Sequence, residues 1–339
     1  MTFVDRLVAT WYAPRPTLLA RVLWPLSLVF RAIVACRRAL YRIGLLRARA
    51  LRVPVIVVGN VNVGGAGKTP LTLALANALA ERGHHPGIVS RGYGGSNVMP
   101  RAVEAGDDAH VVGDEPLLYA KAGLPVWIGR RRAAAAAALI AAQPNIDVVI
   151  ADDGLQHYAL ERAMEIVVVD AARELGNGML LPAGPLREPA ARLLEADAVV
   201  RLVSRDDAYP AAAGAPSTRM WLETLPWRNL ALADLAPTFD AWLPGTVHAI
   251  AGIAHPERFF ALLRKIGIEA QYHPFPDHHF YSRDDLVFAG ARAILMTEKD
   301  AVKCAAFADD RFWYLPVRAR IDPALVELVL ERIHGYQAA

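Results

Sequence analysis

The sequence contains only two cysteines, Cys36 and Cys304, and they lie far apart. Such a pair supplies neither a disulfide framework nor a metal knuckle, so we expect a protein of a reducing compartment. The neighbouring histidines His278 and His279 are not accompanied by other histidines or cysteines at zinc spacing. The sequence therefore predicts no zinc site.

Acidic residues are scarce near the N-terminus. Residues 1–52 contain ten arginines and a single acid, Asp5, although the whole chain has a net charge of only +3. All of the positive excess thus lies in this segment. Arginine stripes also bind nucleic acid, but we find no RNA- or DNA-binding motif, so we expect no nucleic-acid partner.

A long uninterrupted apolar run is missing too. Residues 18–36 are mostly apolar, but Arg21 and Arg31 interrupt them, and Pro25 would kink a helix. The longest charge-free run, residues 22–30, is much shorter than the roughly 20 residues of a clean membrane span. No small-residue cleavage site follows a short apolar core, so we expect no removable signal peptide.

The arginines of this segment are spaced for one stripe of a helix. The stripe comprises Arg31, Arg38, Arg42 and Arg49. With aromatic residues nearby, the pattern favours a basic amphipathic segment over residues 1–50 that lies on an anionic membrane surface. A full span with snorkelling arginines and a helical hairpin packed on the protein are the alternatives.

The remaining composition is that of a globular protein with a large core. The chain has 339 residues, of which 54% are hydrophobic and 21% charged. Strand and helix patterns alternate along it, which predicts an α/β fold. We expect a P-loop NTPase-like, mostly parallel sheet with flanking helices over residues 51–226, and a smaller C-terminal α/β domain over residues 227–339.

The clearest motif is an apolar run that leads into a glycine-rich turn, Gly-Lys-Thr and a helical pattern. This is the order of a P-loop, in which backbone N–H groups and the N-terminus of the helix face phosphate oxygens. Lys68 would reach the β- and γ-phosphates of ATP, and the Thr69 hydroxyl would ligate Mg²⁺. Asn62 replaces the first glycine of the strict motif and tolerates left-handed backbone angles. The predicted nucleotide site comprises Asn62, Val63, Gly64, Gly65, Ala66, Gly67, Lys68 and Thr69.

A second apolar run ends in two acids, Asp152 and Asp153. A buried strand that ends in a carboxylate is typical of a Walker B element, whose acid faces the Mg²⁺ of the nucleotide. Two adjacent acids cannot both point into the core, so at least one should face the site. The polar turn that follows carries Gln156 and His157, and a histidine here is as consistent with a structural role as with a functional one.

Two other loops carry candidate side chains. Arg91 and Tyr93 follow a short strand, where a parallel sheet binds ligands, although a plain surface loop is equally consistent with them. Arg187 and Glu188 are the only charged residues of a proline-rich loop, and they either shape the site or form a simple salt bridge.

Adjacent acids also precede Pro116. Asp114 and Glu115 either cap a helix or place a carboxylate near the phosphates as a base or magnesium ligand. The residues alone leave both interpretations open.

Taken in order, these motifs resemble those of the tetraacyldisaccharide 4′-kinases of lipid A biosynthesis, over about residues 10–330. The matching set is Gly59-Asn60, Gly64-Gly65-Ala66-Gly67-Lys68-Thr69, Ser90-Arg91-Gly92-Tyr93, Gly113-Asp114-Glu115-Pro116, Asp152-Asp153-Gly154-Leu155-Gln156-His157, Leu181-Pro182-Ala183-Gly184-Pro185-Leu186-Arg187-Glu188, Asp277-His278-His279-Phe280 and Thr297-Glu298-Lys299-Asp300. The resemblance implies ATP- and Mg²⁺-dependent phosphorylation of the 4′-hydroxyl of a tetraacylated glucosamine disaccharide 1-phosphate, giving lipid IVA. It places the enzyme at the cytoplasmic face of the bacterial inner membrane, either peripherally or through a single N-terminal anchor.

The resemblance also implies a role for each candidate residue. Asp114 would be the general base, paired with His278, and Lys68 would neutralise charge on the transferred phosphoryl group. Asp153 and Arg187 would complete the catalytic set. Thr69, Glu115 and Asp152, or Asp153 in its place, would hold Mg²⁺. Arg91, Tyr93, Gln156, His157 and Glu188 would bind the lipid substrate.

Two other functions stay open. A membrane-attached ATPase of the partitioning type phosphorylates no lipid. The pattern of such ATPases has an extra lysine just before the two glycines, and this chain has Val63 at that position, which counts against this function. A nucleotide-binding partner without catalysis is less consistent with the acids near Asp114 and Asp152 and with His278.

Overall fold

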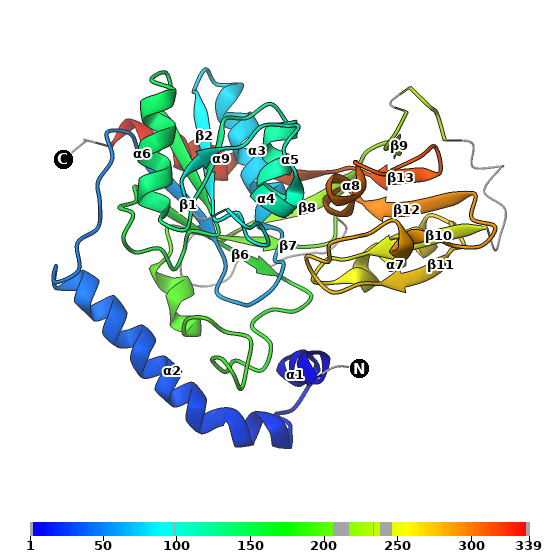
Figure 1. Cartoon of the computed structure of the whole chain (residues 1–339). Coiled ribbons are helices and arrows are strands. Elements are labelled where there is room, and N and C mark those ends of the chain that lie inside the picture. The colour runs from blue at the N-terminus through cyan, green and yellow to red at the C-terminus, as the bar shows by residue number, and fades with distance from the viewer. Residues whose placement is uncertain (1–2, 98, 206–216, 233, 238–245, 337–339) are drawn as a thin grey trace. The chain divides into compact units, whose positions relative to one another are not determined.

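The computed structural model describes residues 3–97, 99–205, 217–232, 234–237 and 246–336. Contacts divide the chain of Figure 1 into two compact units. Unit 1 comprises Met1–Arg91, Gly129–Leu222 and Ala319–Ala339, and unit 2 comprises Gly92–Ile128 and Glu223–Arg318. This division differs from the boundaries at 50 and 226 that the sequence suggested, because residues 92–128 group with residues 223–318 in unit 2.

Unit 1 contains a parallel sheet and the helices around it. Its helices are α1 (Phe3–Trp11), α2 (Leu18–Arg42), α3 (Lys68–Ala80), α6 (Arg132–Ala142), α9 (Pro323–His334) and the short 3-10 helix η1 (Ala190–Glu195). Its strands are β1 (Val55–Gly59), β2 (Pro86–Ser90), β5 (Val148–Asp152), β6 (Met164–Asp170) and β7 (Ala198–Leu202). Strands β8 (Ser217–Thr224) and β14 (Val317–Ile321) each run across a boundary between the units.

Strand β1 lies near the centre of this sheet. The order through unit 1 is β8-β7-β6-β1-β5-β2, and the neighbouring strands are parallel. Strands β1, β2 and β5 are buried at every position, as expected for parallel strands with both faces covered. The predicted fold class is confirmed. The loop after β1 opens at the carboxyl edge of the sheet, where such folds bind ligands.

Helix α3 begins at Lys68, directly after that loop. Gly67 precedes it with a φ of 90°, and a Cβ there would lie 2.8 Å from a Met220 carbon and 2.9 Å from a Leu202 carbon. Only glycine accommodates both the backbone angle and the close approach. The apolar side chains of α3 recur every fourth residue and are buried, at Leu71, Leu75 and Leu79.

Helix α2 is the long N-terminal helix, and it continues through Pro25 without ending. Ser27 on its buried side donates a hydrogen bond to the Leu180 carbonyl (2.8 Å) and accepts one from the Ala183 N–H (3.1 Å). By length and composition it could cross a membrane, the one such helix in the described part of the chain. Its exposed apolar side chains are Leu18, Val22, Trp24, Leu26, Leu28, Val29 and Ile33.

Unit 2 is a smaller α/β unit. Its helices are α4 (Ala109–Val112), α5 (Asp114–Lys121), α7 (Pro256–Lys265), α8 (Glu298–Cys304) and the 3-10 helix η3 (Asp284–Leu286). Its strands are β3 (Arg101–Ala102), β4 (Val126–Ile128), β9 (Arg228–Asn229), β10 (Val247–Ala251), β11 (Gln271–Pro274), β12 (Ala293–Thr297) and β13 (Phe312–Leu315). Five of them form a sheet in the order β11-β10-β12-β13-β9, in which only the short β9 is antiparallel.

The packing of α5 against α8 explains why residues 92–128 belong to unit 2. Helix α8 follows β12 directly, so α5 is attached to the C-terminal sheet through it. Phe259 and Leu263 of α7 pack with Trp313 of β13 in one core cluster, while Tyr281 and Met296 belong to a second. Each core cluster is therefore built mainly from the C-terminal segment.

Gly59, the last residue of β1, offers a test of this packing. A Cβ there would lie 2.5 Å from the Leu155 Cβ, closer than real contacts allow. We expect Gly59→Ala to lower the free energy of unfolding by about 1–3 kcal/mol, because the turn after β5 must move. Gly106→Ala is the control, since nothing lies within 4 Å of its Cβ position. Chemical denaturation measures both, and equal losses would contradict the expected clash.

Candidate active site

Lys68 is held inside the phosphate loop by a neighbouring asparagine. Its Nζ donates a hydrogen bond to Asn60 Oδ1 (3.1 Å), and Asn60 Nδ2 donates to the Gly64 carbonyl (3.1 Å). Both side chains are buried. The Val63 N–H donates to the Pro185 carbonyl (2.8 Å), so the loop also rests on the proline-rich segment. Asn60 was not predicted as a site residue, because its role depends on where the loop folds back.

Asp153 lies between two cations. Its Oδ1 is 3.4 Å from Lys68 Nζ and 3.1 Å from Arg187 Nη1. Burial raises the pKa of Asp153, but the charges of Lys68 and Arg187 outweigh it and hold the pKa well below its usual range. Arg187 also donates to Gln156 Oε1 (3.4 Å). The structure thus brings together four residues that the sequence predicted separately.

Asp152 differs from its neighbour. It is the last residue of β5, is fully buried, and pairs in register with Val58 of β1. The Ser90 hydroxyl lies 3.5 Å from its Oδ2. About a third of the Asp153 side chain remains exposed, so the two adjacent acids face different surroundings, as expected.

Glu188 is buried among three donors. Its oxygens accept hydrogen bonds from the Tyr158 hydroxyl (2.6 Å) and Gln156 Nε2 (3.1 Å), and Arg192 Nε lies 3.3 Å away. Only 1% of Glu188 is exposed. Its proposed contact with substrate stays a prediction; the contacts seen are internal. Tyr158 and Arg192 were not predicted, because an isolated tyrosine and arginine give no local signal.

His157 is surrounded by positive charge. Burial and the charges of Arg132 and Arg91 lower its pKa to about 4, so the ring is neutral at pH 7. Arg132 is buried and donates to the Gly129 carbonyl (2.8 Å), which fixes it at the start of α6. Arg91 is exposed. These arginines leave the region around His157 suited to an anion.

Asp114 and His278 form the core of a second cluster, in unit 2. Asp114 begins α5 and is 3% exposed, and His278 Nδ1 lies 3.0 and 3.1 Å from its two oxygens. His278 has a φ of 59°, and the Tyr93 ring lies beside it at 4.7 Å between centroids. Residues predicted from distant motifs are therefore neighbours here.

Lys299 completes this cluster. Its Nζ lies 3.1 Å from Glu115 Oε1, 3.6 Å from Asp277 Oδ1 and 3.8 Å from Asp114 Oδ2. Burial raises the pKa of Asp114, but the Lys299 charge and the hydrogen bond from His278 hold it below its ordinary value. Burial opposes the charge of Lys299, but the three carboxylates raise its pKa. In the sequence, Lys299 belongs to the Thr297-Glu298-Lys299-Asp300 motif, but no role was predicted for it.

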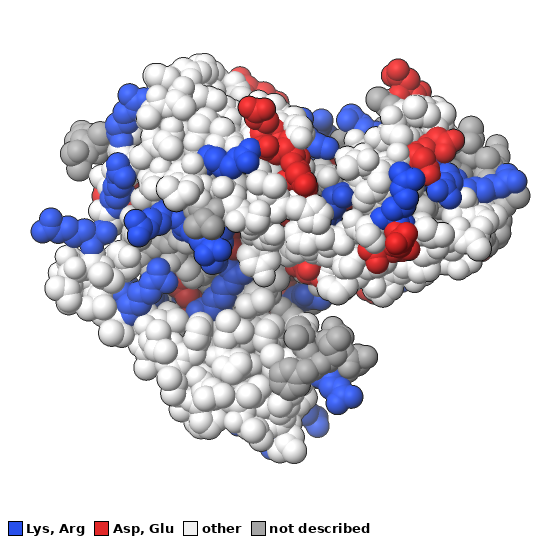
Figure 2. Space-filling view, in the orientation of Figure 1, with Lys and Arg blue, Asp and Glu red and all other residues white. Residues whose placement is uncertain are grey.

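Helix α2 contacts the first cluster through its C-terminal half. The Tyr41 ring lies 5.8 Å from the Tyr158 ring, and the Arg37 guanidinium lies over the same ring at 5.9 Å. Arg38 and Arg42 both form ion pairs with Glu195. In Figure 2 the surface along α2 is mostly uncharged, with arginines gathered at its margins.

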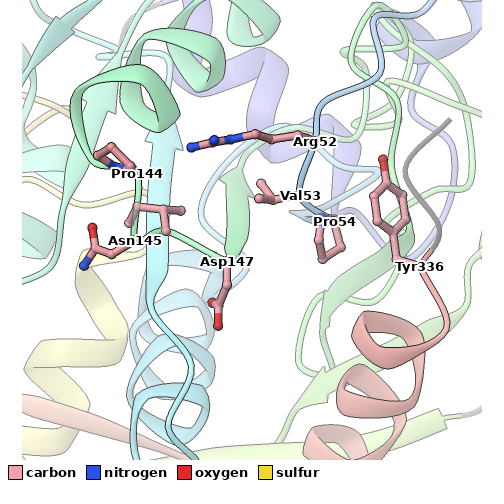
Figure 3. Close-up of a pocket in the computed structure, with 8 residues that line it drawn as sticks. Arg52, Val53, Pro54, Pro144, Asn145, Asp147 and Tyr336 are labelled. Carbon is pink, nitrogen blue, oxygen red and sulfur yellow. The ribbon is translucent and has the colours of Figure 1, made fainter.

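A cavity of about 450 Å³ lies elsewhere in unit 1. Figure 3 shows Arg52 extended toward Pro144 and Asn145, with Tyr336 on the opposite side of the opening. Arg52 precedes β1, and Pro144 and Asn145 precede β5, so this side of the cavity lies at the amino ends of strands whose carboxyl ends carry the phosphate loop and Asp152. None of the predicted site residues lines it.

Comparisons with known proteins agree along almost the whole chain. A family model described as tetraacyldisaccharide-1-P 4′-kinase matches residues 19–334. A tetraacyldisaccharide 4′-kinase from Alkalilimnicola ehrlichii is 50% identical, covering 98% of this chain and 99% of its own. Another from Methylobacillus flagellatus is 47% identical, covering 92% and 91%. A crystal structure of LpxK from Aquifex aeolicus in complex with ATP has a TM-score of 0.79 and 30% identity, covering 93% and 100%.

Asn60 provides a test of the phosphate loop. We expect Asn60→Ala to weaken ATP binding about tenfold or more, because Lys68 loses an acceptor that fixes its ammonium group. Isothermal calorimetry with ATP measures the change. Asn145→Ala, at the cavity, is the matched control and should bind ATP like the wild type. Unchanged affinity in Asn60→Ala would show that Lys68 needs no such support.

Proposed function

The chain belongs to the tetraacyldisaccharide-1-P 4′-kinase family, and from this membership we propose that it phosphorylates the 4′-hydroxyl of tetraacyldisaccharide 1-phosphate with ATP to give lipid IVA. As a family member it is an ATP-dependent kinase of lipid A biosynthesis. The observation that favours a kinase over a partitioning ATPase is the Asp114–His278 pair, a buried carboxylate kept ionised beside a histidine.

The phosphate loop and its neighbours would hold the nucleotide. Phosphoryl transfer requires positioning and charge neutralisation more than covalent chemistry. Lys68 and Arg187 are two cations that converge on Asp153, and both would turn from it toward a bound phosphate. The ATP complex of the Aquifex aeolicus relative supports ATP as the donor.

Mg²⁺ would be held by oxygen ligands near this loop. Mg²⁺ favours hydroxyl, carboxylate and phosphate oxygens, and it commonly takes one or two carboxylates together with the substrate phosphates. Thr69 and Asp152 offer such oxygens, whereas Asp153 already faces two cations, so we assign the Walker B role to Asp152. Glu115 is the third proposed ligand, and its Oε1 pairs with Lys299 here. The ion would neutralise charge on the phosphates.

Asp114 would take the proton of the acceptor hydroxyl. The O–H bond breaks, its oxygen attacks the γ-phosphorus, and the bond to the β-phosphate oxygen breaks to release ADP. A loose transition state needs a positioned base more than a strong one, which suits a carboxylate whose pKa is low. His278 would orient that carboxylate through Nδ1.

Helix α2 would place the enzyme at the cytoplasmic face of the inner membrane. Its exposed apolar side chains and flanking arginines suit a surface with anionic lipids, where an acylated substrate also lies. We propose the substrate contacts predicted for Arg91, Tyr93, Gln156, His157 and Glu188. Arg91 and Tyr93 are exposed, while Glu188 acts from a buried position.

The decisive assay follows the γ-phosphate of labelled ATP into tetraacyldisaccharide 1-phosphate in detergent micelles. The wild type should form a phosphorylated lipid. Asp114→Ala should lower kcat by about 10²–10⁴-fold while ATP still binds, because the base is lost. A wild type that hydrolyses ATP on membranes but forms no lipid product would support the partitioning-type ATPase instead.

The exposed face of α2 gives a second test. We expect a Leu26→Ser, Val29→Ser and Ile33→Ser triple variant to raise KM for lipid in vesicles about tenfold or more, because three apolar side chains no longer enter the lipid. KM for ATP should stay within about twofold, since these side chains lie outside the phosphate loop. Val287→Ser, exposed in unit 2, is the control. Equal changes in both KM values would contradict a membrane role for this face.

A further inference from the structure

We propose that helix α2 does more than hold the enzyme at a membrane: through Tyr158 it positions the side chains that surround Lys68. Seating α2 on lipid would then raise the rate of transfer as well as the local substrate concentration. Tyr158 is a positioning residue in this scheme. The proposal rests on the lipid kinase function and the membrane association proposed above, and it adds a coupling that neither of them requires.

Few side chains of α2 are buried, so packing alone fixes the position of this helix on the rest of unit 1 only weakly. Ala20 and Ser27 are its two buried side chains among those described, while seven large apolar side chains of the helix are exposed. A lipid surface that binds one arrangement of the helix better than others shifts the population toward that arrangement. The effect reaches the site only if α2 touches something connected to it.

Tyr158 is the point of contact. Tyr41 and Arg37 of α2 both lie against its ring, at 5.8 and 5.9 Å. Arg162, in the loop before β6, lies over the same ring at 5.3 Å. A cation over an aromatic ring is attracted to the negative face of that ring, so α2 can favour one position of the Tyr158 ring.

The hydroxyl of Tyr158 links the position of its ring to Glu188 through a hydrogen bond. Burial and the nearby Glu188 charge raise the pKa of Tyr158, so the phenol keeps its proton and donates it at 2.6 Å. A charge-assisted hydrogen bond of this length is among the stronger kinds. Because Glu188 is buried, its carboxylate has little freedom to replace that donor with water.

Glu188 in turn fixes the Gln156 amide. Gln156 Nε2 donates to Glu188 Oε1 (3.1 Å), and Gln156 Oε1 accepts from Arg187 Nη1 (3.4 Å). An amide rotated by 180° would oppose its oxygen to a carboxylate and its NH₂ to a guanidinium, so one orientation is enforced. Arg187 then contacts Asp153 (3.1 Å), which contacts Lys68 (3.4 Å).

A second route from α2 ends at the same carboxylate. Arg38 and Arg42 pair with Glu195, whose Oε2 lies 3.8 Å from Arg192 Nη1. Arg192 is buried, and its Nε lies 3.3 Å from Glu188 Oε2. Both routes therefore converge on Glu188, and all of their members belong to unit 1. The geometry makes Glu188 the junction between the helix and the phosphate site.

The test compares transfer rates on vesicles and in detergent micelles. The vesicles contain phosphatidylethanolamine and phosphatidylglycerol with tetraacyldisaccharide 1-phosphate. We expect the wild type to have a kcat several-fold higher on vesicles than in micelles. Tyr158→Phe keeps the ring but removes the hydroxyl, and it should lower kcat on vesicles about tenfold and bring the vesicle-to-micelle ratio near one. KM for ATP should stay within about twofold.

A second variant approaches the contact from α2. Tyr41→Ala removes the ring that touches Tyr158 and leaves every hydrogen bond of Glu188 in place. It should lower the vesicle-to-micelle ratio as Tyr158→Phe does. The double variant should be no worse than the poorer single variant, because two changes on one route are not additive.

Tyr336→Phe is the matched control. Its hydroxyl donates to the Leu51 carbonyl (2.9 Å) in unit 1, so it loses one hydrogen bond but lies outside both routes. Its vesicle-to-micelle ratio should equal that of the wild type. Thermal denaturation of all variants separates lost coupling from lost folding.

Three results would overturn the coupling. They are an equal kcat of the wild type on vesicles and in micelles, an unchanged ratio in Tyr158→Phe, or multiplicative losses in the double variant. Each of them leaves the lipid kinase assignment intact. The absence of phosphorylated lipid in both media would instead count against the proposed function, and the coupling would fall with it.

Discussion

In both units, buried carboxylates determine which side chains must pack beside them. An ionised acid taken out of water is costly unless cations or donors surround it, so each one dictates what must pack beside it. In unit 1, Glu188 is surrounded by donors from Tyr158, Gln156 and Arg192. In unit 2, Asp114 collects His278 and Lys299. His278 lies 164 residues along the chain from Asp114, and Tyr158 lies 30 residues from Glu188, so folding must bring these partners together.

A third buried acid, Asp300, stabilises the cluster around Asp114 indirectly, without contacting Asp114 itself. Its carboxylate pairs with Lys303 (2.8 Å) and accepts hydrogen bonds from the Tyr281 hydroxyl (3.1 Å) and the Gly252 N–H. The Gly252 carbonyl accepts from the His278 N–H (3.3 Å). Helix α8, which carries Asp300, is thereby fixed relative to the turn of His278, and it presents Lys299 to the acids around Asp114.

Much of the fold could be predicted because its signals are local. The apolar run before Gly59, the glycine-rich turn and the spacing of leucines in α3 each specify one element, and their order identifies a P-loop. The order of the motifs likewise predicted the family and the ATP-dependent kinase function, and the comparisons confirm both. The roles of individual residues, the magnesium ligands and the membrane face stay proposals.

What escaped prediction depends on how the chain folds back on itself. Tyr158 and Arg192 act through Glu188 and Glu165, 30 and 27 residues away, and neither periodicity nor spacing marks these pairs. Asn60 has partners only 4 and 8 residues away, but its role depends on the conformation of the phosphate loop. The grouping of residues 92–128 with unit 2 had the same cause, because the packing of α5 on α8 leaves no trace in either segment alone. A single sequence does not show which charged residues pair across long separations in the chain.

The discontinuous make-up of unit 2 has a consequence for the order in which a ribosome delivers its parts. Asp114 precedes its partner His278 by 164 positions. At about 5–20 residues per second, roughly 8–33 s pass between their synthesis. Strands β1, β2, β5, β6 and β7 of unit 1 emerge before or within that interval, whereas the carboxylate at the start of α5 must wait in water for the histidine and lysine that allow its burial. The parallel sheet of unit 1 can therefore begin to assemble on the nascent chain well before unit 2 is complete.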